Sequence, residues 1–242
     1  VSANIRCKMK LVTINGLKFI CEDPLEGWRA KTLFTKEEGT VRWIRQVVQA
    51  DDVFYDIGAN IGIYSLLAAQ KIDTGRVYAF EPHIISAHHL LRNIRANDMQ
   101  NKISVITSAV HNKDEFLSFN YKYVNPGSSD SQFGNTMGEG GDAFTPAASE
   151  IKHGVTLDRL IDEKVISLPK HIKIDVDGNE LLVLRGMEKI LHSFPPRSLQ
   201  VEIHPENGKM IGDYLSNFGF IEKERHYTTF GKNEIEKGSR PE

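Results

Sequence analysis

Residues 53–62 read Val-Phe-Tyr-Asp-Ile-Gly-Ala-Asn-Ile-Gly, and this stretch decides the fold. Its first five residues are β-branched, aromatic or apolar apart from Asp56, a composition typical of a buried strand. Two glycines with Asn60 between them follow, and an apolar pattern with helical spacing comes next. A strand, a glycine-containing turn and a helix form the first unit of a doubly wound α/β domain. The backbone N–H groups of such a turn are expected to bind a ligand carboxylate or phosphate.

The spacing of the turn residues separates two classes of ligand. A dinucleotide-binding fingerprint reads G-x-G-x-x-G, whereas here Gly58 and Gly62 stand four positions apart. Asn60 tolerates positive φ, so the tight turn survives without a middle glycine. The pattern D-x-G-x-N-x-G, which begins at Asp56, resembles the S-adenosylmethionine loop of class I methyltransferases. The wording D-I-G-A-N-I-G resembles the FkbM methyltransferase family in particular; the alternative is a turn that binds nothing.

The composition is that of an ordinary globular protein. The 242 residues are 40% hydrophobic and 26% charged, which is enough for a sizeable core. A net charge of −2 argues against nucleic acid or an anionic membrane as a partner. No run approaches the roughly 18 apolar residues of a membrane helix, and the first residues lack a signal-peptide core. We therefore expect a cytoplasmic protein in which Cys7 and Cys21 are thiols rather than a disulfide.

The N-terminal part is expected to form a cap on the nucleotide-binding core. Residues 10–35 alternate loosely around Asn15-Gly16, which predicts a hairpin with extended flanks. Residues 36–49 carry apolar side chains on one helical face. We accordingly assign residues 1–50 to a hairpin and helix cap, and residues 51–242 to a methyltransferase domain.

The rest of the chain alternates strands with helices. Strands are expected at 76–80, 102–107, 171–175 and 198–203, with further terminal strands from Phe220 onward. Helices are expected between them, at 155–161, 180–192 and 207–217 and in a segment with a buried stripe of Ile84, Ala87, Leu91 and Ile94. This order predicts an α/β Rossmann-like, doubly wound, mainly parallel seven-stranded sheet with helices on both faces, plus the N-terminal β/α cap.

One long segment departs from this alternation. Residues 117–123 predict an extra half-buried strand, and residues 122–152 then have loop composition without a period. A connection this long is usually functional or disordered. A mobile lid over the acceptor pocket is one interpretation, and plain surface disorder is the other.

Glu81 follows the second strand of the core. It lies 25 positions after Asp56, close to the roughly 20 expected for the acid that accepts from ribose hydroxyls. The alternative is a solvated strand-end acid. His83, His88 and His89 come next, but their spacing lacks a partnered cysteine or carboxylate, so we interpret them as solvated residues of a helix face.

The strand assignments bring titratable groups to one sheet edge. In parallel α/β sheets the ligand lies beyond the carboxyl ends of the strands. Those ends carry Asp56, Glu81, Asp175 with Asp177, and Glu202 with His204.

The family resemblance extends over residues 36–205. Residues 172–180 look like the family's I-K-I-D-V-E-G-x-E segment, with Asp177 in place of glutamate, and residues 201–204 look like its V-E-I-H. Lys36 to Thr40 resembles a K-E-P-E-T segment but departs from it at positions 38 and 39. The resemblance implies S-adenosyl-L-methionine as the cofactor and S-adenosyl-L-homocysteine as the product. It implies cofactor contacts from Glu37, Asp56, Gly58, Asn60, Gly62, Glu81, Ser108, Ala109 and Asp175, with 108–109 against the adenine ring.

The reaction that this resemblance implies is O-methylation of a hydroxyl on a small molecule or sugar. The protein then aligns the acceptor with the methyl group and removes its proton. Asp175, with a pKa raised if the site is dry, and His204 are the candidate catalytic pair. For His204 the alternative is a strand-end histidine bonded to backbone. For Glu37 it is a solvated carboxylate at a helix start.

Other functions remain as alternatives to this prediction. Asp175, Asp177, Glu202 and His204 could ligate Mg²⁺, although we do not favour a metal. A nicotinamide oxidoreductase on the same fold is disfavoured by the missing middle glycine. A cofactor-binding protein without turnover is the non-enzymatic alternative.

Overall fold

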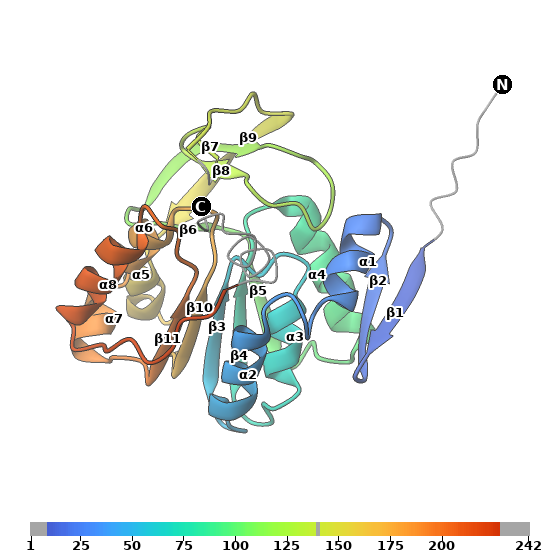
Figure 1. The fold of residues 1–242 in the computed structure, drawn as a ribbon, viewed down its shortest axis with the longest axis horizontal. Coiled ribbons are helices and arrows are strands. Elements are labelled where there is room, and N and C mark those ends of the chain that lie inside the picture. The colour runs from blue at the N-terminus through green and yellow to red at the C-terminus, as the bar shows by residue number, and fades with distance from the viewer. Residues whose placement is uncertain (1–8, 139–140, 228–242) are drawn as a thin grey trace, which may run out of the picture.

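The computed structural model describes residues 9–138 and 141–227 (Figure 1). The chain begins with an antiparallel hairpin, β1 (Lys10–Ile14) and β2 (Leu17–Cys21), joined by Asn15 and Gly16 at positive φ, as predicted. The extended flank expected after this hairpin is wrong, because helix α1 (Pro24–Lys31) follows. Asp23 and Glu26 cap its N-terminus reciprocally, and a proline opens its first turn.

The central sheet is parallel, with the order β11-β10-β3-β4-β5. Its strands are β3 (Val53–Ile57), β4 (Arg76–Phe80), β5 (Ile103–Ile106), β10 (His171–Ile174) and β11 (Ser198–Val201). Within the part of the chain that the structure describes, the sheet has these five strands rather than the seven expected. Residues 221–227 form no strand, and residues 228–242 lie outside the described part.

The strand order reverses between β3 and β10. From β3 the chain proceeds to β4 and β5 on one side, and it later returns to add β10 and β11 on the other. Such a switch point leaves a crevice at the carboxyl ends of the two strands, where α/β proteins bind ligands. The predicted turn at Gly58 and the residues after Ile174 meet at this position.

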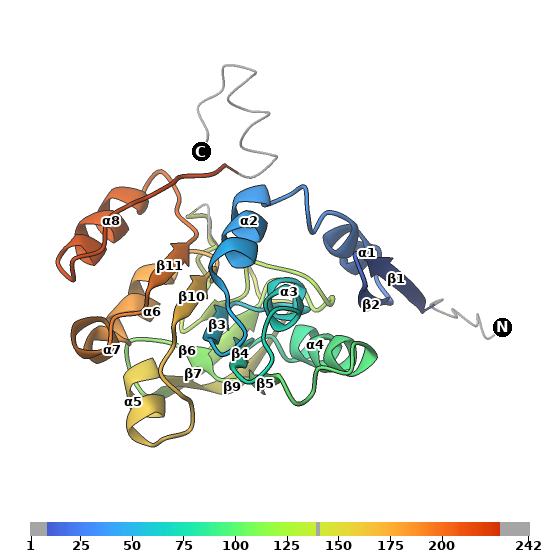
Figure 2. The ribbon, with the colours of Figure 1, turned by 90° about the horizontal axis from the view of Figure 1, so that it is seen from below.

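Helices cover both faces of the sheet, as expected (Figure 2). One face carries α2 (Glu38–Val47), α3 (Ile63–Ala69) and α4 (Ile84–Ala96). The other carries α5 (Leu157–Asp162), α6 (Glu180–Arg185), α7 (Glu188–Ser193) and α8 (Gly208–Ser216). Successive residues of β3 alternate between the two cores: Phe54 packs with the first group and Tyr55 with the second.

The helix expected over 180–192 is broken into α6 and α7. Gly186 ends α6, and a Cβ at this position would overlap the backbone carbonyl of His111. The Gly186 carbonyl accepts from the Asp158 N–H instead of continuing the helix. Contacts with distant segments therefore break the helix, although the apolar pattern of its sequence continues.

A second sheet takes up part of the expected lid loop. Its order is β6-β9-β7-β8, with β6 (Ala109–Val110), β7 (Glu115–Tyr121), β8 (Gln132–Phe133) and β9 (Ala148–Val155). The half-buried strand expected near residue 117 is confirmed as β7. Interpreting 122–152 as loop was wrong over β8 and at the start of β9, since both pair with β7 and lie above the main sheet in Figure 1.

No helix in residues 9–138 or 141–227 has both the length and the apolar character needed to cross a membrane. Cys21 is a free, buried thiol, and burial raises its pKa to about 11. Cys7 lies outside the described residues.

The buried face of α4 includes Ala87 and Ile94, as expected, but not the other two residues of the expected stripe. Leu90 is fully buried and contacts the turn at Gly62, whereas Leu91 is 53% exposed and Ile84 is 49% exposed. The helix starts at Ile84, and its position against β2 turns Leu90 rather than Leu91 toward the core.

This difference predicts unequal effects of two neighbouring truncations. Leu90→Ala should lower the free energy of unfolding by about 2–5 kcal/mol, because it leaves a cavity in the core. Leu91→Ala should change it by no more than about 0.5 kcal/mol. Urea unfolding of both variants measures the difference, and equal losses would contradict this placement of α4.

Candidate functional site

The glycine turn after β3 has the backbone that its sequence predicts. Gly58, Asn60 and Gly62 have φ values of 82°, 51° and 89°. A Cβ on Gly58 would overlap the carbonyl oxygen of Asp175, and one on Gly62 would overlap the side chain of Leu90. Gly58 therefore combines a left-handed conformation with a close approach between the backbones at the ends of β3 and β10.

The turn does not offer the free amides that we expected. The N–H groups of Gly58 and Ala59 donate to the Phe80 carbonyl at 3.0 and 2.9 Å. The Ile61 N–H donates to Asn60 Oδ1, and the Gly62 N–H donates to the Ala59 carbonyl. Hydrogen bonds within the protein thus hold the turn in place. These four N–H groups are therefore not free to bind a ligand carboxylate.

Asp56 is fully buried beneath this turn. Its Oδ2 accepts from Ser65 Oγ at 2.5 Å, and its Oδ1 lies 4.0 Å from Lys173 Nζ. Burial raises the pKa of this carboxyl against the opposing charge of Lys173. Because Asp56 has no exposed surface, it contacts Ser65 and Lys173 rather than a ligand.

Glu81 lies beside the turn, immediately after β4. Its Oε2 accepts from the Asn60 N–H at 2.6 Å, and its Oε1 accepts from the His83 N–H at 2.7 Å. Burial raises the pKa of Glu81 to about 7, although both backbone bonds oppose the shift. The alternative of a solvated strand-end acid is wrong, since this residue is 6% exposed.

Two of the three neighbouring histidines are buried rather than solvated. His83 caps the N-terminus of α4, where its Nδ1 accepts from the Ser86 N–H and its Nε2 lies 3.0 Å from the Tyr123 carbonyl. Burial lowers the pKa of His83, consistent with a neutral ring that donates through Nε2. His89 is buried 2.6 Å from Glu26, and only His88 is exposed as expected.

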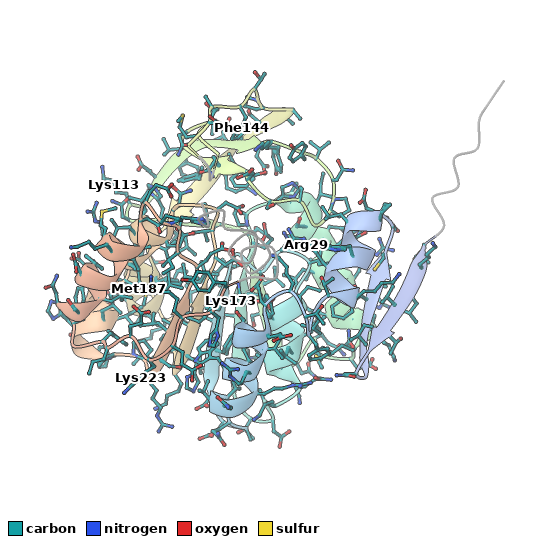
Figure 3. All side chains as sticks on the ribbon, in the orientation of Figure 1. Arg29, Lys113, Phe144, Lys173, Met187 and Lys223 are labelled. Atoms are coloured by element: carbon teal, nitrogen blue, oxygen red, sulfur yellow. The ribbon has the colours of Figure 1, made fainter. Side chains whose placement is uncertain are left out.

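A segment that we call the strap, residues 123–132, crosses the crevice. The Ser128 carbonyl accepts from Asn60 Nδ2 at 2.9 Å, and the Gly127 carbonyl accepts from Arg29 Nε at 2.5 Å. Figure 3 shows Arg29 on α1 next to the strap. At the other end the Asp130 N–H donates to Asp177 Oδ2 at 2.7 Å. The strap therefore ties α1, the glycine turn and the loop after β10 together.

A cavity of about 50 Å³ lies between the turn and the second sheet. Its lining joins the ends of β3 and β4 to the start of the second sheet: Ile57, Gly58, Phe80, Pro82, Ala109, Val110, His111, Phe119, Ser131, Phe133, Val176 and Asn179. Ala109, which we expected beside an adenine ring, lines this mostly apolar space. Ser108 precedes it and is not part of the lining.

Charged side chains that the sequence analysis treated separately lie together at the loop after β10. Lys173 Nζ lies 2.7 Å from Asp175 Oδ2, and Glu202 hydrogen-bonds the same carboxyl. Burial favours the neutral acid, yet the Lys173 ammonium holds the pKa of Asp175 well below its ordinary value. The raised pKa expected for Asp175 is therefore wrong. Sequence reasoning missed Lys173, which differs from surface lysines only by standing inside a strand.

The remaining candidates lie around this loop. His204 follows β11, and its N–H donates to Asn207 Oδ1 at 2.8 Å. Glu180 is fully buried and accepts from the Val176 and Gly178 N–H groups, so it shapes the loop that carries Asp177.

Glu37 lies at the start of α2, with its side chain only 13% exposed. It pairs with Lys36 at 3.0 Å, and its charge raises the pKa of Tyr64 after the larger effect of burial. The alternative of a solvated carboxylate is therefore wrong. The structure places Glu37 on the side of the crevice that holds Tyr64 and Lys173.

The metal alternative finds no support in the geometry. Across residues 9–138 and 141–227, no three His, Cys, Asp or Glu side chains gather as metal ligands. Asp177 is engaged with the strap, while Asp175 and Glu202 face each other and Lys173.

The strand order and the turn define the class as the α/β methyltransferase fold. The crystal structure of methyltransferase FkbM from Methylobacillus flagellatus KT shares it, with a TM-score of 0.50 and 18% identity over 70% of this chain and 38% of that chain. Residues 56–224 match the Methyltransferase FkbM domain. Because this match covers more than half of the chain, the protein belongs to the FkbM methyltransferase family.

Two methyltransferases resemble the chain in sequence. The hexuronic acid methyltransferase AglP of Haloferax volcanii is 25% identical over 77% of this chain and 70% of its own length. The methyltransferase sdnD of Sordaria araneosa is 27% identical over 55% of this chain and 60% of its own length. The family and these relatives support methyltransferase activity for the protein.

The close approach at Gly58 generates a prediction with an internal control. Gly58→Ala adds a methyl group that overlaps the Asp175 carbonyl, and it also incurs the cost of positive φ. Gly219→Ala incurs only the second cost of about 1–2 kcal/mol, since its φ is also positive but no atom lies within 4 Å. Urea unfolding should show a clearly larger loss for Gly58→Ala. Equal losses would mean that the two backbones are not in contact.

Proposed function

We propose that the protein is an S-adenosylmethionine-dependent O-methyltransferase that acts on a hydroxyl of a sugar or small molecule. The observation that carries the proposal is the buried carboxylate of Glu81, fixed beside the glycine turn at the switch point of the sheet. Each of its oxygens accepts one backbone N–H and keeps a lone pair, so it can accept from two ribose hydroxyls. Membership of the FkbM family supports the same cofactor.

The lining of the cavity, rather than its volume of about 50 Å³, suits the base of the cofactor. Its lining combines Phe80, Pro82 and Ala109 with few polar groups, an environment that favours a flat heteroaromatic ring. Gly58, Asn60 and Gly62 then set the turn against the nucleoside, and Asp56 acts beneath them. The remaining cofactor positions, Glu37, Ser108 and Asp175, complete this proposed binding surface.

The strap is proposed as the lid of the site. It lies across the crevice through the Asn60 to Ser128 bond, so cofactor entry requires this bond to open or rearrange. Arg29 and Asp177 anchor its two sides, which would return it to the same place after binding. The proposed N-terminal cap thereby contributes to the site through α1.

The general base is proposed at the edge formed by Asp175 and His204. Because Lys173 keeps Asp175 ionised with a low pKa, that carboxylate is better suited to accept a hydrogen bond than to take a proton at neutral pH. His204, whose imidazole is a common general base in enzymes, is then the residue that takes the hydroxyl proton. Asp175 aligns the acceptor or the cofactor.

The Glu81 carboxyl predicts a pH-dependent affinity. Ribose hydroxyls donate to the ionised form, and the pKa of Glu81 is about 7 without ligand. Affinity for S-adenosylmethionine should therefore rise about tenfold from about pH 6 to about pH 8. Isothermal titration calorimetry of the wild type and of Glu81→Ala measures it. The variant should bind weakly and without this pH response.

The matched control is Glu188→Ala, which removes a carboxylate from α7 on the far face of the sheet. It should bind as the wild type does. Wild-type affinity in Glu81→Ala would contradict the assignment of the crevice. Binding of NAD(H) in place of S-adenosylmethionine would favour the oxidoreductase alternative.

Acceptor chemistry is tested with methyl glycosides of neutral hexoses and of hexuronic acids. The relative named as a hexuronic acid methyltransferase motivates this panel, and uronic acids offer both a hydroxyl and a carboxylate. Release of S-adenosylhomocysteine with an alkali-stable methyl ether is the expected result. An alkali-labile methyl ester would contradict hydroxyl methylation, and cofactor binding without transfer across the panel would favour a protein without turnover.

A further inference from the structure

Lys173 is an unusual residue for the interior of a parallel sheet. Its side chain is 1% exposed, and its register partner on β3 is Asp56, so both point to the face covered by α2 and α3. The ammonium lies 5.0 Å from the centre of the Tyr64 ring. Removing an ammonium from water costs several kcal/mol, and an apolar side chain would fill the same space without that cost. Packing alone therefore does not explain a charged side chain at this position.

The charges around Lys173 form a line from the interior to the crevice. Asp56 is fully buried and held by Ser65, while Asp175 is 26% exposed. Lys173 lies between them, 4.0 Å from Asp56 Oδ1 and 2.7 Å from Asp175 Oδ2. Figure 3 shows Lys173 near the middle of the molecule. Of these three charged side chains, only Asp175 can meet a ligand.

The backbone fixes where that exposed carboxylate lies. The Asp175 N–H donates to the Ile57 carbonyl at 3.0 Å, and its own carbonyl abuts Gly58. Asp175 is thus attached to the glycine turn through its main chain and to Lys173 through its side chain. Both constraints act on one residue at the switch point.

We propose that Lys173 is a positioning residue for methyl transfer, whose buried ammonium, backed by Asp56, holds the Asp175 carboxylate in one orientation and one charge state beside Gly58. The proposal rests on the proposed function and adds the residue that prepares the site for a cationic cofactor. The sulfonium of S-adenosylmethionine is positive and is lost on conversion to S-adenosylhomocysteine. A fixed negative carboxylate at the crevice favours the charged cofactor over the neutral-sulfur product.

Other titratable groups surround the pair of Asp175 and Lys173 and influence its titration. They come from every element packed around it: Asp56 on β3, Glu202 after β11, Lys36 and Glu37 before α2, Tyr64 on α3 and Glu180 on α6. Most are acidic, so removal of the Lys173 charge leaves the carboxyls to repel one another. Asp175 then takes up a proton at a higher pH than in the wild type.

The test compares Lys173→Met, Lys173→Arg and the wild type, with S-adenosylmethionine as the probe in calorimetry from about pH 5 to about pH 8. Affinities are expressed as the ratio of variant to wild-type Kd at each pH, which removes the titration of Glu81. For Lys173→Met this ratio should rise at least about fivefold as the pH falls, because Asp175 becomes protonated. Lys173→Arg keeps the positive charge and should give a flat ratio.

Lys102→Met is the matched control, because Lys102 precedes β5 and bonds the Ile72 carbonyl away from the crevice. It should give a flat ratio. A flat ratio in Lys173→Met as well would overturn the proposal and leave the proposed function intact. If the wild type does not bind S-adenosylmethionine, the proposed function falls and this inference falls with it.

A second measurement avoids any loss of folding in Lys173→Met. Carboxyl ¹³C NMR of the wild-type protein should show no titration of Asp175 between about pH 4.5 and about pH 7, because the ammonium keeps the carboxyl ionised. A titration step of Asp175 inside that range would overturn the proposal without use of a variant.

Discussion

The contact between the backbones of Gly58 and Asp175 is the constraint on which the rest of the site depends. It joins the ends of β3 and β10, the two strands at which the sheet reverses its order. Any side chain at position 58 would separate them. With the two ends in contact, the carboxylates that follow β4 and β10 lie at the same edge of the sheet.

The acidic residues of this edge have separate electrostatic environments. Burial raises the pKa of Glu81 to about 7 although Lys152 opposes the shift. Asp175 is paired with Lys173, and its pKa is lowered. Two carboxyls of the same chemistry thus differ in mean charge near neutral pH, because burial favours the neutral form of Glu81 and an ammonium favours the ionised form of Asp175.

Much of the architecture was predictable because its signals are local. The hairpin at Asn15-Gly16, the strands β3 and β4 and the positive φ of Asn60 each follow from a few adjacent residues. Predictions failed where distant segments decide the outcome. Strand β9 pairs with β7 although a long loop precedes it in the sequence. Two N–H groups of the glycine turn donate to the Phe80 carbonyl of the neighbouring strand. Neither partner can be identified from the local sequence.

The sequence by itself determined the class of fold, the family resemblance and the acidic residues at the strand ends, because strand and turn propensities are local and the ends of parallel strands share one edge. Only the tertiary structure decided which of those acids are buried, which are paired and what they contact. Lys173 shows the difference: its position in a strand can be predicted from the sequence, but its approach to Asp56 depends on the pairing of β10 with β3. Burial and pairing depend on groups far apart in the chain, and these groups meet only after folding.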